Sequence, residues 1–246
     1  MARNSASNHS FLDKYRDETA THAYSLVLVL PLILIYEAGI LMVSEYSWHD
    51  TTVLANEAIV LLFDRLGLAQ ANLVPAFLVM ATLFGLQFAT AKPWRIRFGN
   101  IPLLHLEYAL YAFILFIGVV WMFPGALVYR SPEPIDALLS IGAGIYEEFI
   151  FRLVLLSLCM ALLEKGLKVE KMRGLGTSVV VTALCFAGFH YILGGDPFRW
   201  GDFWVRVAAG IYFGIICLTR GYGLAAGTHA GFNLLIVAFT RAGIPS

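Results

Sequence analysis

The segment GIYEEFIFR carries two adjacent glutamates and an arginine in an otherwise apolar part of the chain. On an α-helix, Glu148 and Arg152 lie four residues apart on one face, where they can form an ion pair. Glu147 then points about 100° away from Glu148. Because the ion pair neutralises one carboxylate, the other can act as a general base toward a water molecule. A structural ion pair needs only one glutamate, so two adjacent glutamates predict chemistry as well as packing.

Two other apolar segments carry polar side chains at helical spacing. In CFAGFHYIL, Phe186 and His190 share a helix face, and in GTHAGFNLL, His229 and Asn233 share another. Two polar side chains aimed at one point can donate hydrogen bonds to a developing oxyanion. An ordinary hydrogen bond between helices is the structural alternative for each pattern. Packing alone explains three such patterns in three separate segments less readily, so we expect one active site.

The composition places these residues in a membrane. The chain has 246 residues, of which 59% are hydrophobic and 14% are charged, whereas soluble domains contain about 25% charged residues. The net charge is zero, which argues against nucleic-acid binding because phosphate recognition needs a basic surface. The cysteines fit no metal-binding or disulfide pattern and are interpreted as packing residues. An ionisable side chain in lipid is costly unless it is paired or hydrated, so each one is a candidate site residue.

Segments with few or no charges are long enough to span a bilayer, which takes about 20 residues. We expect an all-α, multi-pass transmembrane helical bundle of about seven spans, built as a single domain over 1–246. The expected spans are 24–43, 66–91, 108–129, 135–163, 174–195, 203–219 and 221–240. A short helix over 52–64 suits the membrane surface and would be the eighth span if it also crosses. The three motifs fall within 140–240, which is the expected catalytic core.

Glycines at four-residue spacing occur in the last two expected spans. Gly210 and Gly214 form one such pair, and Gly223, Gly227 and Gly231 form two overlapping pairs. Small residues at this spacing let helices approach one another closely in lipid. These two spans are therefore expected inside the bundle.

Positive charges predict the orientation in the membrane. The polar segment 1–23 has no small-residue cleavage site, so the first span is expected to be an uncleaved anchor. Loops on the N-terminal side contain eleven Lys and Arg residues, and those on the other side contain five. The positive-inside rule then places the N-terminus in the cytoplasm. The short loops favour a multi-pass protein of a prokaryotic plasma membrane.

The three motifs together resemble the CPBP family, which contains the type II CAAX prenyl endopeptidases and bacteriocin-processing or self-immunity proteins. They read Glu-Glu-x-x-x-Arg, Phe-x-x-x-His and His-x-x-x-Asn, in this order, and the resemblance covers about 140–240. All seven motif positions are present: Glu147, Glu148, Arg152, Phe186, His190, His229 and Asn233. The resemblance implies that Glu148 and Arg152 hold the geometry and charge of the site.

The same resemblance implies an all-helical intramembrane glutamic endopeptidase that needs no cofactor. By position, Glu147 and His190 would activate the attacking water, and His229 with Asn233 would stabilise the oxyanion. The expected partners are the lipid bilayer and a peptide substrate that is membrane-anchored or lipid-modified.

Two other interpretations remain open. Glu147, His190 and His229 could form a zinc site with a position for water, which would make the protein a membrane metalloprotease. Glu37 and Glu107 are further carboxylates at or near the membrane, and they favour a non-enzymatic transporter, immunity or scaffold protein. The lack of a detectable two-fold sequence repeat weighs against a transporter.

Overall fold

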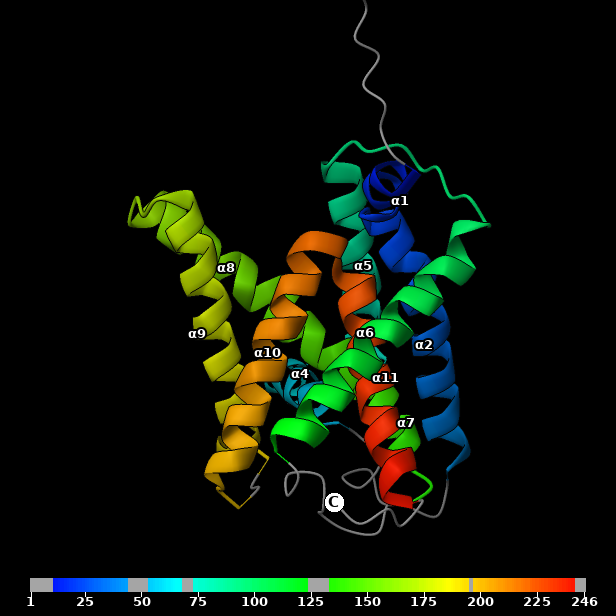
Figure 1. Ribbon diagram of the computed structural model, residues 1–246, viewed down its shortest axis with the longest axis vertical. Helices are drawn as coiled ribbons and strands as arrows, with labels where there is room; N and C mark the ends of the chain where they lie inside the picture. Colours follow the sequence, from blue (N-terminus) through cyan, green and yellow to red (C-terminus); the bar gives the residue numbers. More distant parts are fainter. Residues whose placement is uncertain (1–10, 44–52, 68–72, 124–132, 195–196, 242–246) are drawn as a thin grey trace, which may run out of the picture.

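A computed structural model describes residues 11–43, 53–67, 73–123, 133–194 and 197–241 of the protein. Within these ranges all regular elements are helices and no strand occurs, which confirms the expected all-α class. Figure 1 shows the helices packed as a bundle, with α1 (Phe11–Thr19) at one end and the end of the last helix at the other.

Five helices are long and apolar enough to cross a membrane. They are α2 (His22–Met42), α6 (Asn100–Met122), α9 (Lys171–Ile192), α10 (Trp200–Arg220) and α11 (Tyr222–Arg241). Four of them agree with predicted spans to within three residues at each end, whereas α6 begins eight residues before the expected span 108–129 and ends seven residues before its end. Large apolar side chains on these helices are exposed, among them Phe113 and Ile215, as expected of surfaces that contact lipid.

Two further predicted spans correspond to less regular elements. The apolar helix α5 (Val74–Ala89) has only 16 residues. The span expected over 135–163 is a continuous helical segment, in which α7 (Asp136–Glu148) is followed by η1 (Phe149–Leu156), α8 (Ser157–Ala161) and η2 (Leu162–Gly166). The total of seven spans therefore stays a prediction. The short helix expected over 52–64 is present as α4 (Leu54–Arg65).

The segment η1 is a π-helix, where the sequence predicted a continuous α-helix. It begins directly after Glu148 and contains Arg152. Such turns are rare and occur frequently at functional sites. The Phe151 ring packs edge-on against Phe186 and Phe189 of α9, with both centroid distances at 5.3 Å. This aromatic contact holds the wide turn against the neighbouring helix.

Small residues let α11 pack deep in the bundle. A Cβ atom on Gly144 of α7 would lie only 2.6 Å from the Ala226 carbonyl oxygen of α11. A Cβ atom on Gly227 would lie 2.9 Å from the Tyr108 ring of α6. The glycine spacing in the last span therefore marks close helix contacts, as predicted.

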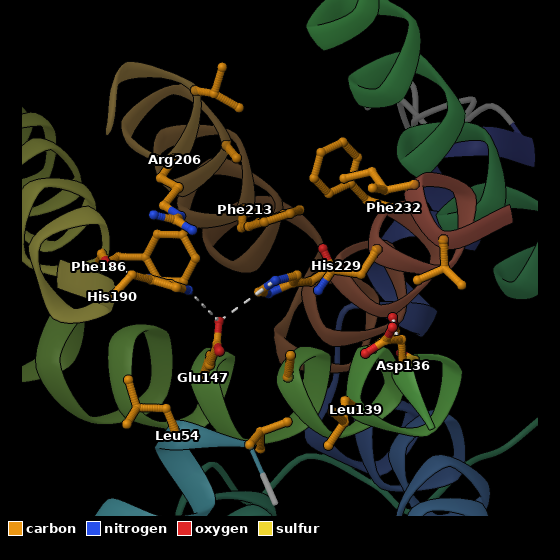
Figure 2. A pocket seen from close by; sticks show the side chains of 18 of the residues that line it. Leu54, Asp136, Leu139, Glu147, Phe186, His190, Arg206, Phe213, His229 and Phe232 are labelled. Carbon is orange, nitrogen blue, oxygen red and sulfur yellow. Dashed lines mark hydrogen bonds and ion pairs between the residues drawn. The ribbon is translucent and has the colours of Figure 1, made fainter. Parts of the chain in front are cut away.

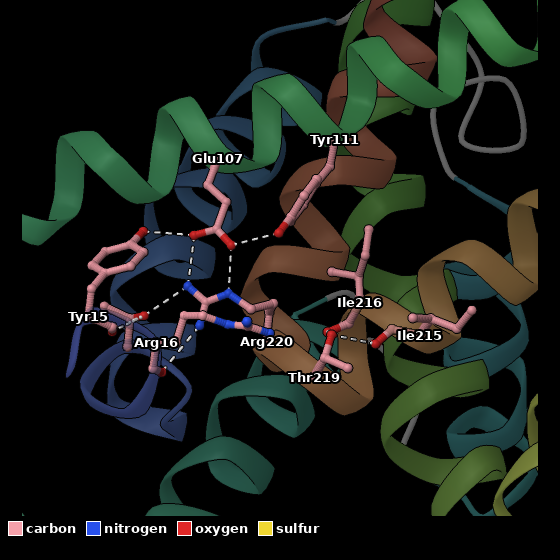
Figure 3. A network of polar contacts seen from close by, with 9 residues as sticks. Tyr15, Arg16, Glu107, Tyr111, Ile215, Ile216, Thr219 and Arg220 are labelled. Carbon is pink, nitrogen blue, oxygen red and sulfur yellow. Dashed lines mark hydrogen bonds and ion pairs between the residues drawn. The ribbon is translucent and has the colours of Figure 1, made fainter. Parts of the chain in front are cut away.

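Two carboxylates outside the motifs are paired inside the bundle. Nε and Nη2 of Arg220, at the end of α10, donate to the two carboxylate oxygens of Glu107 at 2.6 and 2.7 Å (Figure 3). The Tyr15 hydroxyl donates to the same carboxylate at 2.8 Å and so attaches α1 to the bundle. Burial and this carboxylate raise the pKa of Tyr15 well above its ordinary value. Glu37 accepts a hydrogen bond from the Tyr146 hydroxyl, so both carboxylates have polar partners inside the bundle.

Candidate active site

Glu147 lies between two histidines that come from different helices (Figure 2). Its Oε2 atom is 3.8 Å from Nε2 of His190 on α9 and 3.8 Å from Nε2 of His229 on α11. Both distances are too long for a direct hydrogen bond, but a water oxygen can bridge Glu147 to either histidine at about 2.8 Å from each atom. Glu147 is only 6% exposed, so a water held there would be largely shielded from bulk solvent.

The adjacent Glu148 contacts a different set of partners. Its Oε2 atom lies 3.1 Å from Nε of Arg152, and its Oε1 atom lies 2.9 Å from Nδ1 of His229. The side chains of Glu148 and Arg152 are both fully buried. The predicted ion pair is therefore present, and the two consecutive carboxylates point to separate surroundings.

Arg152 connects three helical segments. Its Nη2 atom donates a hydrogen bond to the Gly210 carbonyl oxygen of α10 at 3.1 Å. Its Cζ atom lies 4.8 Å from the centroid of the Phe186 ring on α9. An aromatic face stabilises a guanidinium that is removed from water, so this ring and the carboxylate of Glu148 together compensate the buried charge.

Hydrogen bonds determine where the imidazole protons lie. Nδ1 of His190 is 3.0 Å from the Phe186 carbonyl oxygen, which can only accept, so this nitrogen carries a hydrogen. Nδ1 of His229 likewise donates to the carboxylate of Glu148 at 2.9 Å. In their neutral forms both rings therefore direct an Nε2 lone pair toward the same carboxylate. The Phe213 ring stacks on His229 at a centroid distance of 4.5 Å and fixes its plane.

A cavity of about 440 Å³ opens beside these groups. Four of the six predicted site residues line it, namely Glu147, His190, His229 and Asn233, and the other two, Glu148 and Arg152, lie behind it. Asn233 is one helical turn after His229 on α11. The walls are mainly apolar side chains of α10 and α11, including Val205, Ala209, Phe213, Phe232 and Ile236.

Three charged residues at the cavity were not predicted from the sequence. Asp136 begins α7, and Asp202 and Arg206 lie four residues apart near the start of α10. Asp202 is buried and lies 3.5 Å from Nε of Arg199. The i, i+4 spacing of Asp202 and Arg206 was the available signal, but both residues look like ordinary charges that flank a span.

The residues of the alternative zinc site face one point. Glu147, His190 and His229 approach each other through Oε2 and the two Nε2 atoms. Within the part of the chain that the structure describes, however, no group of three His, Cys, Asp or Glu side chains is arranged closely enough to hold a metal ion.

Comparison with known families identifies the same part of the chain. Residues 134–235 match the family model described as type II CAAX prenyl endopeptidase Rce1-like. This match covers all the motif residues and confirms the resemblance drawn from them. No significant match to the chain was found among curated proteins or among solved structures.

Proposed function

We propose that the protein, whose residues 134–235 match the family model described as type II CAAX prenyl endopeptidase Rce1-like, is an intramembrane endopeptidase of the glutamic type. It hydrolyses a peptide bond in a membrane-associated or lipid-modified peptide. The proposal places it in a prokaryotic plasma membrane with seven spans, two of which are α5 and the segment from α7 to η2.

The observation that carries the proposal is the position of the Glu147 carboxylate, 3.8 Å from Nε2 of both His190 and His229. A water molecule between these atoms can donate one hydrogen bond to Glu147 and one to His190. Its lone pair is then available to attack a carbonyl carbon in the cavity. Glu147 acts as the general base and His190 orients the water.

The proton balance of this reaction needs no covalent nucleophile. Glu147 takes a proton from water as the water oxygen bonds to the carbonyl carbon, and the carbonyl electron pair moves onto oxygen. When the tetrahedral intermediate collapses, the C–N bond breaks. The proton on Glu147 then passes to the leaving nitrogen.

His229 and Asn233 stabilise the oxyanion. His229 donates from Nε2, while its Nδ1 atom lies 2.9 Å from the Glu148 carboxylate, which holds the ring in place. The Asn233 amide supplies a second donor.

Cleavage by the purified protein tests this assignment. A panel of lipidated and bacteriocin-like membrane peptides is incubated with the wild type, with Glu147→Gln and with Glu170→Gln, an exposed control of the same chemistry. Loss of the general base should lower kcat by about 10²–10⁴-fold, and the control should retain full activity. Cleavage that persists in both Glu147→Gln and His190→Ala would overturn the assignment.

One observation favours the zinc alternative. Both histidines donate from Nδ1 to an oxygen and direct Nε2 to the same point, as metal-binding histidines do. Zinc held by Glu147, His190 and His229 would polarise water and the substrate carbonyl. Inhibition by a chelator that added zinc reverses would establish this alternative, and full activity of metal-stripped protein would exclude it.

A further inference from the structure

The cavity opens at one end of the bundle. Asp136 is the first residue of α7, Asp202 lies in the first turn of α10, and Thr240 is next to the last residue of α11. All three line the cavity, and Figure 1 shows these helix ends together at the end of the molecule opposite α1. Glu147 lies eleven residues further along α7 than Asp136, which corresponds to about 16 Å of helix.

Basic residues are concentrated at the opposite end. Those on α1, in the α5–α6 connection and around the η2–α9 connection are Lys14, Arg16, Lys92, Arg95, Arg97, Lys165, Lys168, Lys171 and Arg173. The described basic residues on the side of the opening are Arg65, Arg199, Arg206 and Arg241. Because cytoplasmic loops of membrane proteins are enriched in Lys and Arg, the end that carries α1 faces the cytoplasm.

Exposed aromatic rings mark the membrane surface near the opening. Phe198, Trp200 and Trp204 lie at the start of α10 and are exposed. Trp94 and Phe98 are exposed before the start of α6, at the other end of the bundle. Aromatic rings, Trp above all, gather where hydrocarbon meets the headgroups. The cavity therefore opens at a membrane surface, on the side away from the cytoplasm.

We propose that the cavity is entered from the non-cytoplasmic face and receives an apolar, extended peptide segment next to a membrane anchor. Apolar side chains such as Val205, Phe213 and Ile236 form its walls, and the scissile bond must reach Glu147 well below the opening. The nature of the substrate rests on the proposed function. The direction of entry rests only on the helix ends, the basic residues and the aromatic rings.

Labelling of single cysteines in intact cells tests the direction of entry. The three native cysteines, Cys159, Cys185 and Cys217, are replaced by alanine, and one cysteine is introduced by Thr240→Cys at the opening or by Lys165→Cys at the other end. A membrane-impermeant maleimide should label the Thr240→Cys protein in intact cells. It should label the Lys165→Cys protein only after the cells are permeabilised.

The reverse labelling pattern would overturn the direction of entry. If the cysteine-free protein does not fold, alkaline phosphatase or green fluorescent protein fused after Arg241 of the wild-type chain decides the same question. Entry from the non-cytoplasmic face is supported if the phosphatase fusion is active and the green fluorescent protein fusion does not fluoresce. An inactive phosphatase fusion together with a fluorescent green fluorescent protein fusion refutes it. Labelling at Thr240→Cys in a protein that cleaves no peptide would refute the proposed function and leave the orientation standing.

Discussion

Replacing Arg152 by methionine measures how strongly the buried ion pair supports the site. Methionine has a similar length and no charge, so Arg152→Met removes the guanidinium with a limited change in shape. Glu148, whose side chain is fully buried, loses the cation that lies 3.1 Å away. The hydrogen bond to the Gly210 carbonyl oxygen and the contact with the Phe186 ring are lost as well.

The expected loss of stability follows from the buried Glu148 carboxylate, which the substitution leaves without a cation. Removing one partner of a buried ion pair costs about 3–5 kcal/mol, and contacts made by the same side chain do not add independently. We therefore expect Arg152→Met to lower the free energy of unfolding by about 3–5 kcal/mol. The double variant Arg152→Met/Glu148→Gln no longer buries an unpaired carboxylate, so it should recover at least about 1 kcal/mol of this loss.

Unfolding of the purified protein in mild detergent, followed by tryptophan fluorescence as denaturant is added, gives these free energies. Arg173→Met is the matched control, because the Arg173–Glu170 pair is similar in length at 3.3 Å but largely exposed. Exposed pairs contribute about 0–1 kcal/mol. If Arg152→Met costs no more than Arg173→Met, or if the double variant is less stable than Arg152→Met alone, the buried charge pair does not have the role described.

Three further outcomes are expected. Asn233→Ala should lower kcat by about 10²–10³-fold with little change in KM, because it removes an oxyanion donor; an unchanged kcat in steady-state kinetics would contradict this role. Gly144→Ala should lower the free energy of unfolding by about 1–3 kcal/mol through overpacking against α11, whereas Gly118→Ala, with no atom within 4 Å of the new Cβ, should be neutral or stabilising. Arg220→Met should release α1 and speed trypsin cleavage after Lys14, measured by mass spectrometry, and an unchanged cleavage rate would argue against the attachment.

The helices and the Glu148–Arg152 pair could be predicted because both depend on local spacing. An apolar run of about 20 residues satisfies its backbone groups in lipid as a helix, which accounts for the five long helices. Glu148 and Arg152 are four residues apart and stay in contact at 3.1 Å although the turn between them is π-helical. The four-residue spacing therefore predicted this ion pair correctly, although it did not predict the π-helix.

Long-range contacts could not be predicted in the same way. Glu148 and His229 are 81 residues apart in the sequence, and no spacing rule joins them. The π-helix is held by Phe151 against rings of α9, which is likewise a contact between distant segments. The expected span 203–219 leaves Asp202 outside it, whereas α10 begins at Trp200 and buries this carboxylate at the cavity.

The two adjacent glutamates contact different partners and have different roles in the proposed mechanism. The contact of Glu148 with His229 of α11 at 2.9 Å, and the contacts of its partner Arg152 with Gly210 of α10 and Phe186 of α9, fix the rotation of this helical segment about its axis. A rotation by one residue, about 100°, would turn Glu147 away from the two histidines. The Glu148–Arg152 pair does not line the cavity, yet in the proposed mechanism its contacts determine that Glu147 faces the cavity. One acid sets the rotation of the helix, and this leaves the next one available for chemistry.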